Sequence, residues 1–314
     1  MDKAKKTKLE STYKSKDTEE WLDIKFYRPV GYRFALLFDR FNIHPNIITI
    51  ISIVFGVLAA ICFYDTSITW NASGIGLLIL ANILDSADGQ LARITGKKTL
   101  WGRILDGFAG DIWFFSIYFF IGLRLTPQSM PLGIEHNWGI WIWLLMFLSG
   151  IISHKDQAGL ADYYRNVYMF FHNDKSELTD SEELNSEQSN TPWRKWFWKI
   201  WLFFYQRYTL RQESCTPEFQ LLRRKFKETY DDKIPSSVSS EFCRRTFHLL
   251  KWTNILTFNT RAIVISLSLL IDMPWIYFIF ELTVLNVIYF YMKSSHEKAC
   301  QSIINSIENE QKME

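Results

Sequence analysis

The chain has 314 residues, of which 48% are hydrophobic, 17% aromatic and 22% charged. This apolar and aromatic content excludes an intrinsically disordered chain, a collagen-like repeat and a coiled coil. The net charge of +2 gives no global basic field, so we expect no nucleic acid among the partners. The charged fraction is too high for a chain buried in lipid throughout, so we expect polar segments outside any membrane-spanning part.

The first elements along the chain are a polar tail and a segment of mixed character. Residues 17–44 combine acidic, basic and aromatic side chains, which predicts an amphipathic helix lying on the membrane surface. Six apolar runs follow, and a bilayer-spanning helix needs about 20 mostly apolar residues. We interpret all six as transmembrane helices, the second and third only if their acidic ends lie at membrane depth. The runs are Ile47–Tyr64, Ala72–Leu84, Ile112–Leu123, Trp138–Ser153, Trp252–Ile271 and Pro274–Met292.

A long polar insertion, residues 172–250, separates the fourth and fifth runs. It opens with the acidic stretch NDKSELTDSEELNSEQSN, which is typical of a flexible linker. The next stretch, TPWRKWFWKIWLFFYQRYTLR, combines aromatic and basic side chains. This composition favours a helix anchored in the headgroup layer, and the alternative is a lid or lipid-sensing helix. Residues 217–231 predict another surface helix, with Pro217 at its first position.

The distribution of Lys and Arg predicts the orientation of the helices. With a cytoplasmic N-terminus, 34 of the 35 basic residues lie in cytoplasmic segments if Arg261, inside the fifth run, is counted with the preceding insertion, as the positive-inside rule requires. The exception is Arg124, near the outer end of the third helix, which we expect to pair with Glu281. The sequence thus predicts an all-α polytopic membrane protein with six transmembrane helices and both termini in the cytoplasm. Its expected parts are the tail with the juxtamembrane helix (1–46), helices one to four (47–171), the cytoplasmic insertion (172–250), helices five and six (251–292) and a C-terminal tail (293–314).

Four aspartates gather at the inner ends of the second and third runs. Asp85 and Asp88 follow the second run, and Asp106 and Asp111 precede the third. Each carboxylate inside a membrane costs about 2.5–3.5 kcal/mol, so four at one depth indicate a function. Asp85 and Asp88 share a helix face because they are three residues apart. Oxygen ligands suit Mg²⁺ or Mn²⁺, and two ions about 3.5–4 Å apart would suit displacement at phosphorus.

These acids also have other interpretations. They could pair with Arg93, Lys97 and Arg103 in a solvated turn between the two helices. They would also fit a divalent-metal transporter or channel. Such proteins usually bind their ions at the membrane midplane between inverted repeats, whereas these acids lie off-centre and no internal repeat is visible.

The spacing of the residues favours the metal site. The motif reads Asp85-x2-Asp88-Gly89-x2-Ala92-Arg93-x8-Gly102-x3-Asp106. It resembles the signature of the CDP-alcohol phosphatidyltransferase family, D-x2-D-G-x2-A-R-x8-G-x3-D-x3-D, and seven identities at fixed offsets make the match specific. The resemblance covers residues 20–165 and 250–295, including the HPNIIT stretch at His44–Thr49, and leaves the insertion outside.

One position departs from the family pattern. The last Asp of the pattern falls on Gly110, and this chain has its acid one residue later, at Asp111. One residue turns a helix by about 100°. Three alternatives stay open: a bulge or overwound turn brings Asp111 to the site, another group such as His154 or Asp156 replaces it, or the protein is an inactive relative that binds lipids or partners.

The resemblance implies a reaction and its cofactors. It implies a metal-dependent phosphatidyltransferase of phospholipid biosynthesis, which moves a phosphatidyl group from a CDP-lipid, usually CDP-diacylglycerol, to an alcohol and releases CMP. Asp85, Asp88, Asp106 and Asp111 would bind Mg²⁺ or Mn²⁺, two ions in all. Asp106 and Asp111 would be catalytic, with Asp111 as the general base. The alternative arrangement within the family is a CDP-aminoalcohol that reacts with a lipid hydroxyl.

The resemblance also implies which residues contact the substrates, and structural roles are the alternatives for these residues. Gly89 and Gly102 would admit the nucleotide and Arg93 would contact phosphate, whereas helix packing alone would also explain the glycines. Arg261 is a cation at membrane depth, and with Lys155 it could bind the phosphate of an acceptor. This favours a polyol or polyol phosphate, such as inositol phosphate or glycerol phosphate. The alternatives are that Arg261 is a structural partner for an Asp of the site and that Lys155 is a positive-inside flank.

The expected partners are a CDP-lipid, a small polar alcohol, the lipid bilayer and, from the family alone, a second copy of the chain. We expect the active site at the cytoplasmic face of an integral membrane protein, which would be the inner membrane if the cell is bacterial. The physical reason is that the nucleotide and the alcohol arrive from water, while the acyl chains stay in lipid.

Overall fold

The computed structural model describes residues 9, 17–131, 136–173, 178, 181–230 and 234–313. The chain divides into two compact units, Met1–His154 with Phe258–Thr283 and Lys155–Thr257 with Val284–Glu314. Within the described ranges the structure is helical, with one isolated β-bridge as the exception. The expected all-α fold is therefore confirmed. Most of the expected N-terminal tail, and residues 174–177 and 179–180 of the expected linker, lie outside the described residues.

The first unit contains the motif-bearing helices and also two helices from late in the chain. A π-helical turn at Asp23–Tyr27 leads into α2, and further π-helical segments follow α6 at Phe147–His154 and α14 at Glu281–Leu285. The helices of this unit are α2 (Arg28–Arg40), α3 (Pro45–Cys62), α4 (Ile68–Thr95), α5 (Leu100–Leu125), α6 (Gly139–Met146), α13 (Phe258–Leu270) and α14 (Trp275–Phe280).

The connection between α4 and α5 follows from its capping residues. Gly96 ends α4 with a φ of 69°, the left-handed conformation that a residue without a side chain adopts at a helix C-terminus. Thr99 then caps the N-terminus of α5, because its Oγ1 atom accepts a hydrogen bond from the Gly102 amide at 2.9 Å. The chain therefore reverses within a few residues, and the acidic end of α4 comes next to the start of α5.

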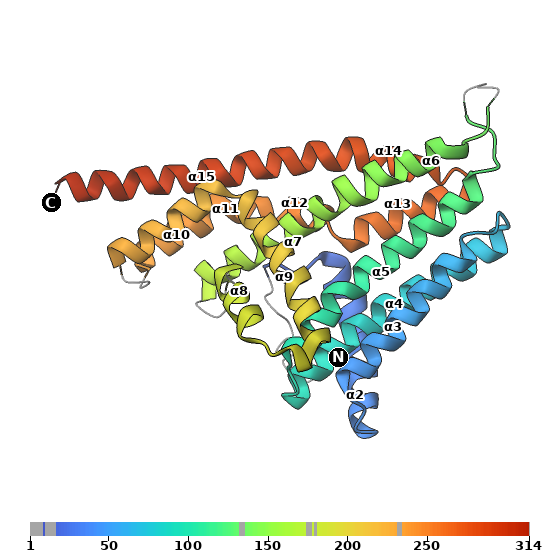
Figure 1. Ribbon diagram of the computed structural model, residues 1–314, viewed down its shortest axis with the longest axis horizontal. Helices are drawn as coiled ribbons and strands as arrows, with labels where there is room; N and C mark the ends of the chain where they lie inside the picture. The colour runs from blue at the N-terminus through green and yellow to red at the C-terminus, as the bar shows by residue number, and fades with distance from the viewer. Residues whose placement is uncertain are drawn as a thin grey trace. The chain divides into compact units, whose positions relative to one another are not determined.

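Close packing holds α3 against both α4 and α5, and Figure 1 shows these three helices side by side. Gly56 of α3 lies against the indole ring of Trp113 in α5, where any added Cβ atom would overlap the ring. Gly74 of α4 lies against Phe63, whose ring atoms would be 2.5 Å from an added Cβ. Small residues at these crossings let the helix backbones approach closely, which fixes the register between the three helices.

The expected amphipathic segment before the first apolar run is helical. Gly31 of α2 packs on α4, where an added Cβ atom would lie 3.0 Å from the Ser86 hydroxyl oxygen and 3.2 Å from the Ala87 nitrogen. Leu36 and Leu37 on the same helix are 40% and 45% exposed. One face of α2 therefore covers α4 between Asp85 and Asp88, while apolar side chains remain exposed on another face.

Five described helical stretches are long and apolar enough to cross a membrane: Pro45–Cys62, Ile68–Thr95, Ile104–Leu125, Ser236–Leu270 and Trp275–Asn309. They include the first, second, third, fifth and sixth expected helices, so the protein is an all-α polytopic membrane protein. The fourth expected helix, Trp138–Ser153, is helical from Gly139 but is not among the five. Its apolar run has only 16 residues and is followed directly by the polar residues that begin with His154. The fifth is also interrupted, since one helix ends at Ile255 and the next begins at Phe258.

The second unit holds the insertion and the C-terminal helix. It is built around buried aromatic side chains, among them Phe171, Phe219 and Phe242, and the rings of Phe171 and Phe242 stack with centroids 4.0 Å apart. Helix α10 begins at Pro217, as predicted. The helices of this unit are α7 (Lys155–Asn173), α8 (Ser181–Asn190), α9 (Trp196–Ser214), α10 (Pro217–Tyr230), α11 (Ser236–Thr246), α12 (Leu250–Ile255) and α15 (Asn286–Met313).

Part of the expected flexible linker is a helix. Residues 181–190 form α8, which packs against α9. The Ser181 amide and hydroxyl both donate to the Glu213 carboxylate, at 3.1 and 2.5 Å, and Leu184 is 4% exposed. An acidic composition predicted a linker, but a capped first turn and one buried leucine are sufficient to attach this helix to α9.

Candidate active site

Three of the four predicted carboxylates come together. Asp85 and Asp88 of α4 and Asp106 of α5 each offer an oxygen atom, and these atoms all lie within 4.8 Å of one another. The i, i+3 spacing places the first two on one face of α4, and the short connection brings the start of α5 beside them. A set of carboxylate oxygens alone is the donor chemistry that Mg²⁺ and Mn²⁺ take. The residues present therefore fit the expected metal ions.

Asp88 is the buried member of this group, and its side-chain partner comes from a different helix. The residue is 3% exposed, and its Oδ2 atom accepts a short hydrogen bond from the hydroxyl of Thr49 in α3. Thr49 is itself 3% exposed. Sequence reasoning did not assign Thr49 to the site, although the HPNIIT stretch that opens the first apolar run contains it. A hydroxyl in the first turn of that helix is the signal that could have identified it.

Arg93 lies beside the carboxylates with donors that have no partner. Its side chain interacts electrostatically with Asp88 and Asp106, and its Nε and Nη2 atoms are buried without a hydrogen-bond partner in the described part of the chain. An added Cβ atom at Gly89 would lie 3.4 Å from Nη2 and 3.5 Å from Nη1. Buried donors are almost always satisfied, so the guanidinium is suited to bind an anion at this position.

Gly102 lies at a position where a side chain would collide with its neighbours. A Cβ atom at this position would lie 2.9 Å from the side-chain oxygen of Asn46 and 3.1 Å from the hydroxyl oxygen of Thr99. The start of α5 therefore approaches the start of α3 closely, and a side chain at this position would push them apart. Contact between Gly102 and a substrate stays a prediction.

Asp111 is separated from Asp106 by the geometry of α5. The helix is α-helical from Leu100 to Leu125, so the bulge or overwound turn, one of the three alternatives for Asp111, is absent from this described helix. Five residues turn an α-helix by about 500°, which leaves Asp111 about 140° around the axis from Asp106. Asp111 is also not among the three carboxylates that approach within 4.8 Å of one another. Its role as general base stays a prediction.

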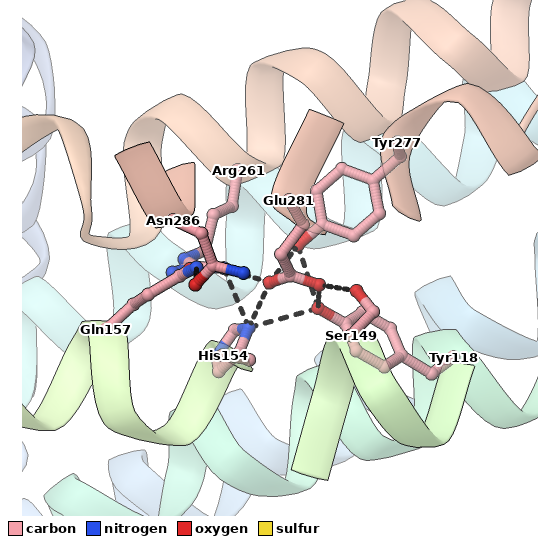
Figure 2. A network of polar contacts seen from close by, with 8 residues as sticks. All are labelled: Tyr118, Ser149, His154, Gln157, Arg261, Tyr277, Glu281 and Asn286. Carbon is pink, nitrogen blue, oxygen red and sulfur yellow. Dashed lines mark hydrogen bonds and ion pairs between the residues drawn. The ribbon is translucent and has the colours of Figure 1, made fainter. Parts of the chain in front are cut away.

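A second polar cluster in this unit contains Arg261 and Glu281, and Figure 2 shows its side chains pointing toward one another. Arg261 of α13 forms an ion pair with Glu281, and the two side chains are 1% and 0% exposed. The other Glu281 oxygen accepts hydrogen bonds from Ser149 and, at 2.7 Å, from Tyr118. Sequence reasoning named both charges but did not predict this pair.

His154 completes the cluster. Its Nδ1 atom lies 2.9 Å from the Glu281 carboxylate and 3.0 Å from the Tyr118 hydroxyl. Ser149 and His154 belong to the π-helical segment Phe147–His154, and Glu281 begins another one. Such segments are rare and occur often at functional sites. Because these π-helical turns shift the register of α6 and α14, they bring three of the polar side chains into one buried cluster.

The expected pair of Arg124 and Glu281 is wrong. Arg124 pairs instead with Asp272 at 2.5 Å, and it donates to the carbonyl oxygens of Phe63 and Asp65 at 3.1 and 2.9 Å. A guanidinium near a helix C-terminus satisfies the last carbonyl groups of that helix. Arg124 therefore caps the end of α3, which explains why a basic residue lies at the C-terminal end of α5.

The remaining candidates lie in the second unit. Lys155 is exposed and lines a small cavity of that unit together with Asp156 and Arg211. Asp156 accepts two hydrogen bonds from Arg211, at 3.0 and 2.6 Å, and this carboxylate raises the pKa of the guanidinium. Asp156, an alternative base in the sequence analysis, is therefore bound in an ion pair within its own unit, and a phosphate contact for Lys155 stays a prediction.

Comparison with known proteins identifies relatives of the motif-bearing region. Residues 42–154 match the family model described as CDP-alcohol phosphatidyltransferase. The chain is also 25% identical over 171 residues to a protein of Aquifex aeolicus (strain VF5) named bifunctional IPC transferase and DIPP synthase, which covers 54% of this chain and 36% of that protein. The chain thus spans about a third of the length of the curated relative that it matches. The family match includes all three clustered carboxylates and Arg93.

Proposed function

We propose that the protein transfers a phosphatidyl group from a CDP-linked lipid to the hydroxyl group of a polar alcohol, because residues 42–154 match the family model described as CDP-alcohol phosphatidyltransferase. The observation that carries the proposal is the group of Asp85, Asp88 and Asp106 within 4.8 Å of one another, with the unpartnered Arg93 donors beside it. A diphosphate is negatively charged, and its oxygen atoms would bind both to metal ions held by the carboxylates and to the Arg93 guanidinium.

The clustered carboxylates supply the divalent ions with ligands. Asp85, Asp88 and Asp106 would hold Mg²⁺ or Mn²⁺, two ions if the family pattern applies in full. Bound there, such ions neutralise charge on the diphosphate oxygens. Thr49 orients the buried Asp88 carboxylate, and Arg93 contacts the phosphate from the same side as Gly89. The chain itself therefore binds and orients the donor.

The reaction exchanges one phosphorus–oxygen bond for another. The acceptor oxygen attacks the phosphorus that carries the lipid, the bond from that phosphorus to the oxygen of CMP breaks, and CMP leaves. The proton of the acceptor hydroxyl passes to a carboxylate. We assign this proton to Asp111, the acid one residue after the position of the last Asp in the family pattern, with Asp106 as a second catalytic carboxylate.

For the acceptor we propose a polyol or a polyol phosphate, with CDP-diacylglycerol as the donor. Lys155 supports this choice, because it is an exposed cation directly after the matched region. Arg261 supports it less, because its guanidinium already pairs with Glu281. The site is proposed to face the cytoplasm, where nucleotide and alcohol are dissolved, and a homodimer is proposed from the family alone.

CMP release by the purified full chain in detergent tests the proposal. The assay contains CDP-diacylglycerol, Mg²⁺ or Mn²⁺, and a panel that includes glycerol phosphate, inositol phosphate, inositol and serine. We expect metal-dependent CMP release with one acceptor, and none from Asp88→Asn. A parallel arm with a CDP-aminoalcohol and diacylglycerol detects the alternative arrangement. Failure to release CMP in every arm would contradict the enzyme assignment.

Arg93 provides a sharper test of phosphate recognition. Arg93→Lys keeps the charge but removes the planar group whose Nε and Nη2 atoms are unpartnered, so we expect a higher KM for the CDP-lipid. Loss of a hydrogen bond to a charged group costs about 1.5–3 kcal/mol, or about 10–100-fold in kcat/KM. Lys97→Gln, on the connection between α4 and α5, is the control. Equal KM values in Arg93→Lys and the unmodified protein would refute the contact.

A further inference from the structure

The C-terminal helix α15 carries a second group of metal-ligating side chains, in the other unit and beyond the last apolar run. His296, Glu297 and Cys300 each offer one ligand atom, and these atoms lie within 4.8 Å of one another. His296 and Cys300 are 2% and 0% exposed. The family match, which ends at residue 154, does not include them. Their chemistry also differs from the carboxylate group, because it combines nitrogen, sulfur and oxygen.

Two of the three separations between these atoms are close to those between ligands of one ion. The His296 Nδ1 atom lies 3.6 Å from the Glu297 Oε1 atom and 3.7 Å from the Cys300 Sγ atom. An N–H···O hydrogen bond is about 2.7–3.2 Å long, so the first distance is too long for one. Tetrahedral zinc has bonds of about 2.0–2.3 Å, which place two of its ligands about 3.3–3.6 Å apart. The observed distances exceed this by a tenth of an ångström or so at most.

The group also contains buried polar atoms without hydrogen-bond partners. Among the described residues, neither the Oε1 atom of Glu297 nor the Nε2 atom of His296 has one. The other Glu297 oxygen is held, because Oε2 accepts a hydrogen bond of 2.8 Å from the Glu218 amide in the first turn of α10. Buried polar atoms are rarely left unsatisfied. A cation between Nδ1, Sγ and Oε1 would give the unpartnered Glu297 Oε1 atom a partner, whereas the Nε2 atom, on the other side of the imidazole ring, is not one of the ligand atoms.

Aromatic side chains fix the imidazole ring in place. Tyr164 of α7 stacks on His296 with centroids 3.7 Å apart and planes 14° apart. The rings of Phe219 and Phe242 meet the same imidazole edge-on, with centroids 5.9 and 5.8 Å away. A ligand held by packing keeps its direction and needs no rearrangement when an ion binds. The burial of His296 and Cys300 also favours a charge-neutralising thiolate–metal bond over a fully solvated ion.

We propose that His296, Glu297 and Cys300 form a binding site for a Zn²⁺-class divalent cation. One imidazole nitrogen, one thiolate and one carboxylate are a donor set that zinc takes and that Mg²⁺ does not. The three residues leave the fourth tetrahedral position to a water molecule. All three ligands lie on α15, and Glu297 also accepts a hydrogen bond from the first turn of α10, so an ion bound there would hold the carboxylate that links the two helices. The proposal is independent of the transferase assignment.

Cobalt substitution tests the site without any assay of activity. The full chain in detergent is stripped with a chelator, supplied with excess Mg²⁺ to occupy the carboxylate group, and titrated with Co²⁺. We expect one equivalent of Co²⁺ to produce the near-ultraviolet charge-transfer band of a thiolate–cobalt bond, and Zn²⁺ to remove it. An all-oxygen site gives no such band. Absence of the band at saturating Co²⁺ in the unmodified protein would overturn the proposal, whatever the variants do.

Matched variants then locate the site. Cys300→Ser should abolish the band and His296→Gln should shift the titration to higher Co²⁺, whereas Cys243→Ser, a thiol on α11 outside the group, should leave it unchanged. Zn²⁺ should raise the Tm of the unmodified protein, because an ion bound to the folded state alone stabilises it, and should not raise the Tm of Cys300→Ser. An unchanged band in Cys300→Ser would show that the cluster is only a thiol–imidazole hydrogen bond.

Discussion

At the scale of single residues, the candidate site depends on contacts that orient carboxylates rather than on the carboxylates alone. Asp88 is buried, and a buried carboxylate needs hydrogen-bond donors to remain charged and correctly directed. Thr49 provides one from α3. The three-carboxylate group is thus assembled from three helices: two supply its ligands and the third supplies a donor.

Replacement of the Thr49 hydroxyl should weaken metal-dependent activity. Thr49→Val has nearly the same shape but cannot donate to Asp88, so we expect a loss of about 10–100-fold in kcat/KM, which corresponds to about 1.5–3 kcal/mol. The Mg²⁺ concentration required for half-maximal CMP release should rise. Thr49→Ser keeps the hydroxyl and is the matched control. Identical metal titrations for Thr49→Val and Thr49→Ser would show that the hydrogen bond does not support the site.

The one-residue offset of Asp111 can be tested by moving the carboxylate. If Asp111 is the general base, Asp111→Ala should reduce CMP release by about 10²–10⁴-fold. The double change Gly110→Asp with Asp111→Ala restores the family spacing, about 40° around the helix from Asp106. A Cβ atom at position 110 meets no atom within 4 Å, so the new side chain has space. We expect activity to recover in the double variant.

The rate of CMP release at saturating substrate decides whether Asp111 is the general base. Wild-type rates of CMP release in Asp111→Ala would place the base elsewhere, and His154→Gln would then be the next variant to measure. Loss of activity in Asp111→Ala without recovery in the double variant would instead show that the offset position is the one that this site requires.

At the scale of helices, the buried cluster around Glu281 joins elements that are far apart in sequence. Arg261 comes from α13, Tyr118 from α5 and His154 from the end of the π-helical segment after α6. All of them meet the Glu281 carboxylate. A buried ion pair adds little stability compared with apolar residues, but loss of one partner leaves an uncompensated charge. The cluster therefore fixes the mutual register of these helices.

Removal of one charge from this cluster should be strongly destabilising. Glu281→Gln leaves the Arg261 guanidinium buried without a counter-charge, and we expect a loss of about 3–5 kcal/mol in the free energy of unfolding. Thermal unfolding in detergent measures it as a lower Tm. The double variant Arg261→Met with Glu281→Leu should recover much of the loss. Glu241→Gln, which breaks an exposed contact with Arg244 and Arg245, is the control and should have little effect.

The contact between α13 and the segment that precedes α2 predicts a dependence of stability on pH. Asn259 donates to the carboxylates of Asp23 and Glu20, at 3.0 and 2.8 Å, and burial raises the pKa of Asp23 to about 6 from 3.8. The folded protein therefore binds the proton more tightly than the unfolded chain between pH 4 and 6. Its stability should fall by about 2–3 kcal/mol as the pH rises through this window, and stay constant above it.

Asp23→Asn carries no titratable proton at this position, so its stability should not change with pH in that window. Chemical unfolding at pH 4.5 and 7 measures the difference for each protein. The same dependence in Asp23→Asn and the unmodified chain would assign the titration to another group.

At the scale of the whole molecule, the two units differ in their relation to known proteins. The family match covers residues 42–154, and the first part of unit one ends at His154. The second unit, with the insertion and α15, lies outside the match. The proposed functions divide in the same way: the oxygen-only site for Mg²⁺ or Mn²⁺ is in the first unit, and the nitrogen, sulfur and oxygen site for Zn²⁺ is in the second.

Several features could be predicted from the sequence because they depend on local order along the chain. Apolar runs of membrane length predict helices, since a helix satisfies its own backbone in lipid. The offsets between Asp85, Asp88 and Asp106 predict a shared site, because helical periodicity and a four-residue connection determine where those side chains lie. The helix at Pro217 was predicted for the same reason, since its first turn has a local signal.

Other features were decided only by the tertiary structure, because they join residues whose separation along the chain carries no geometric information. The partner of Arg261 is 20 residues away and that of Arg124 is 148 away, whereas the expected position of Arg124 and Glu281 toward the outer side favoured a pair between those two. The Thr49–Asp88 bond and the packing of Tyr164 on His296 likewise depend on register between helices. Register is determined by how glycines and aromatic rings pack at each crossing, and this packing exists only in the folded chain.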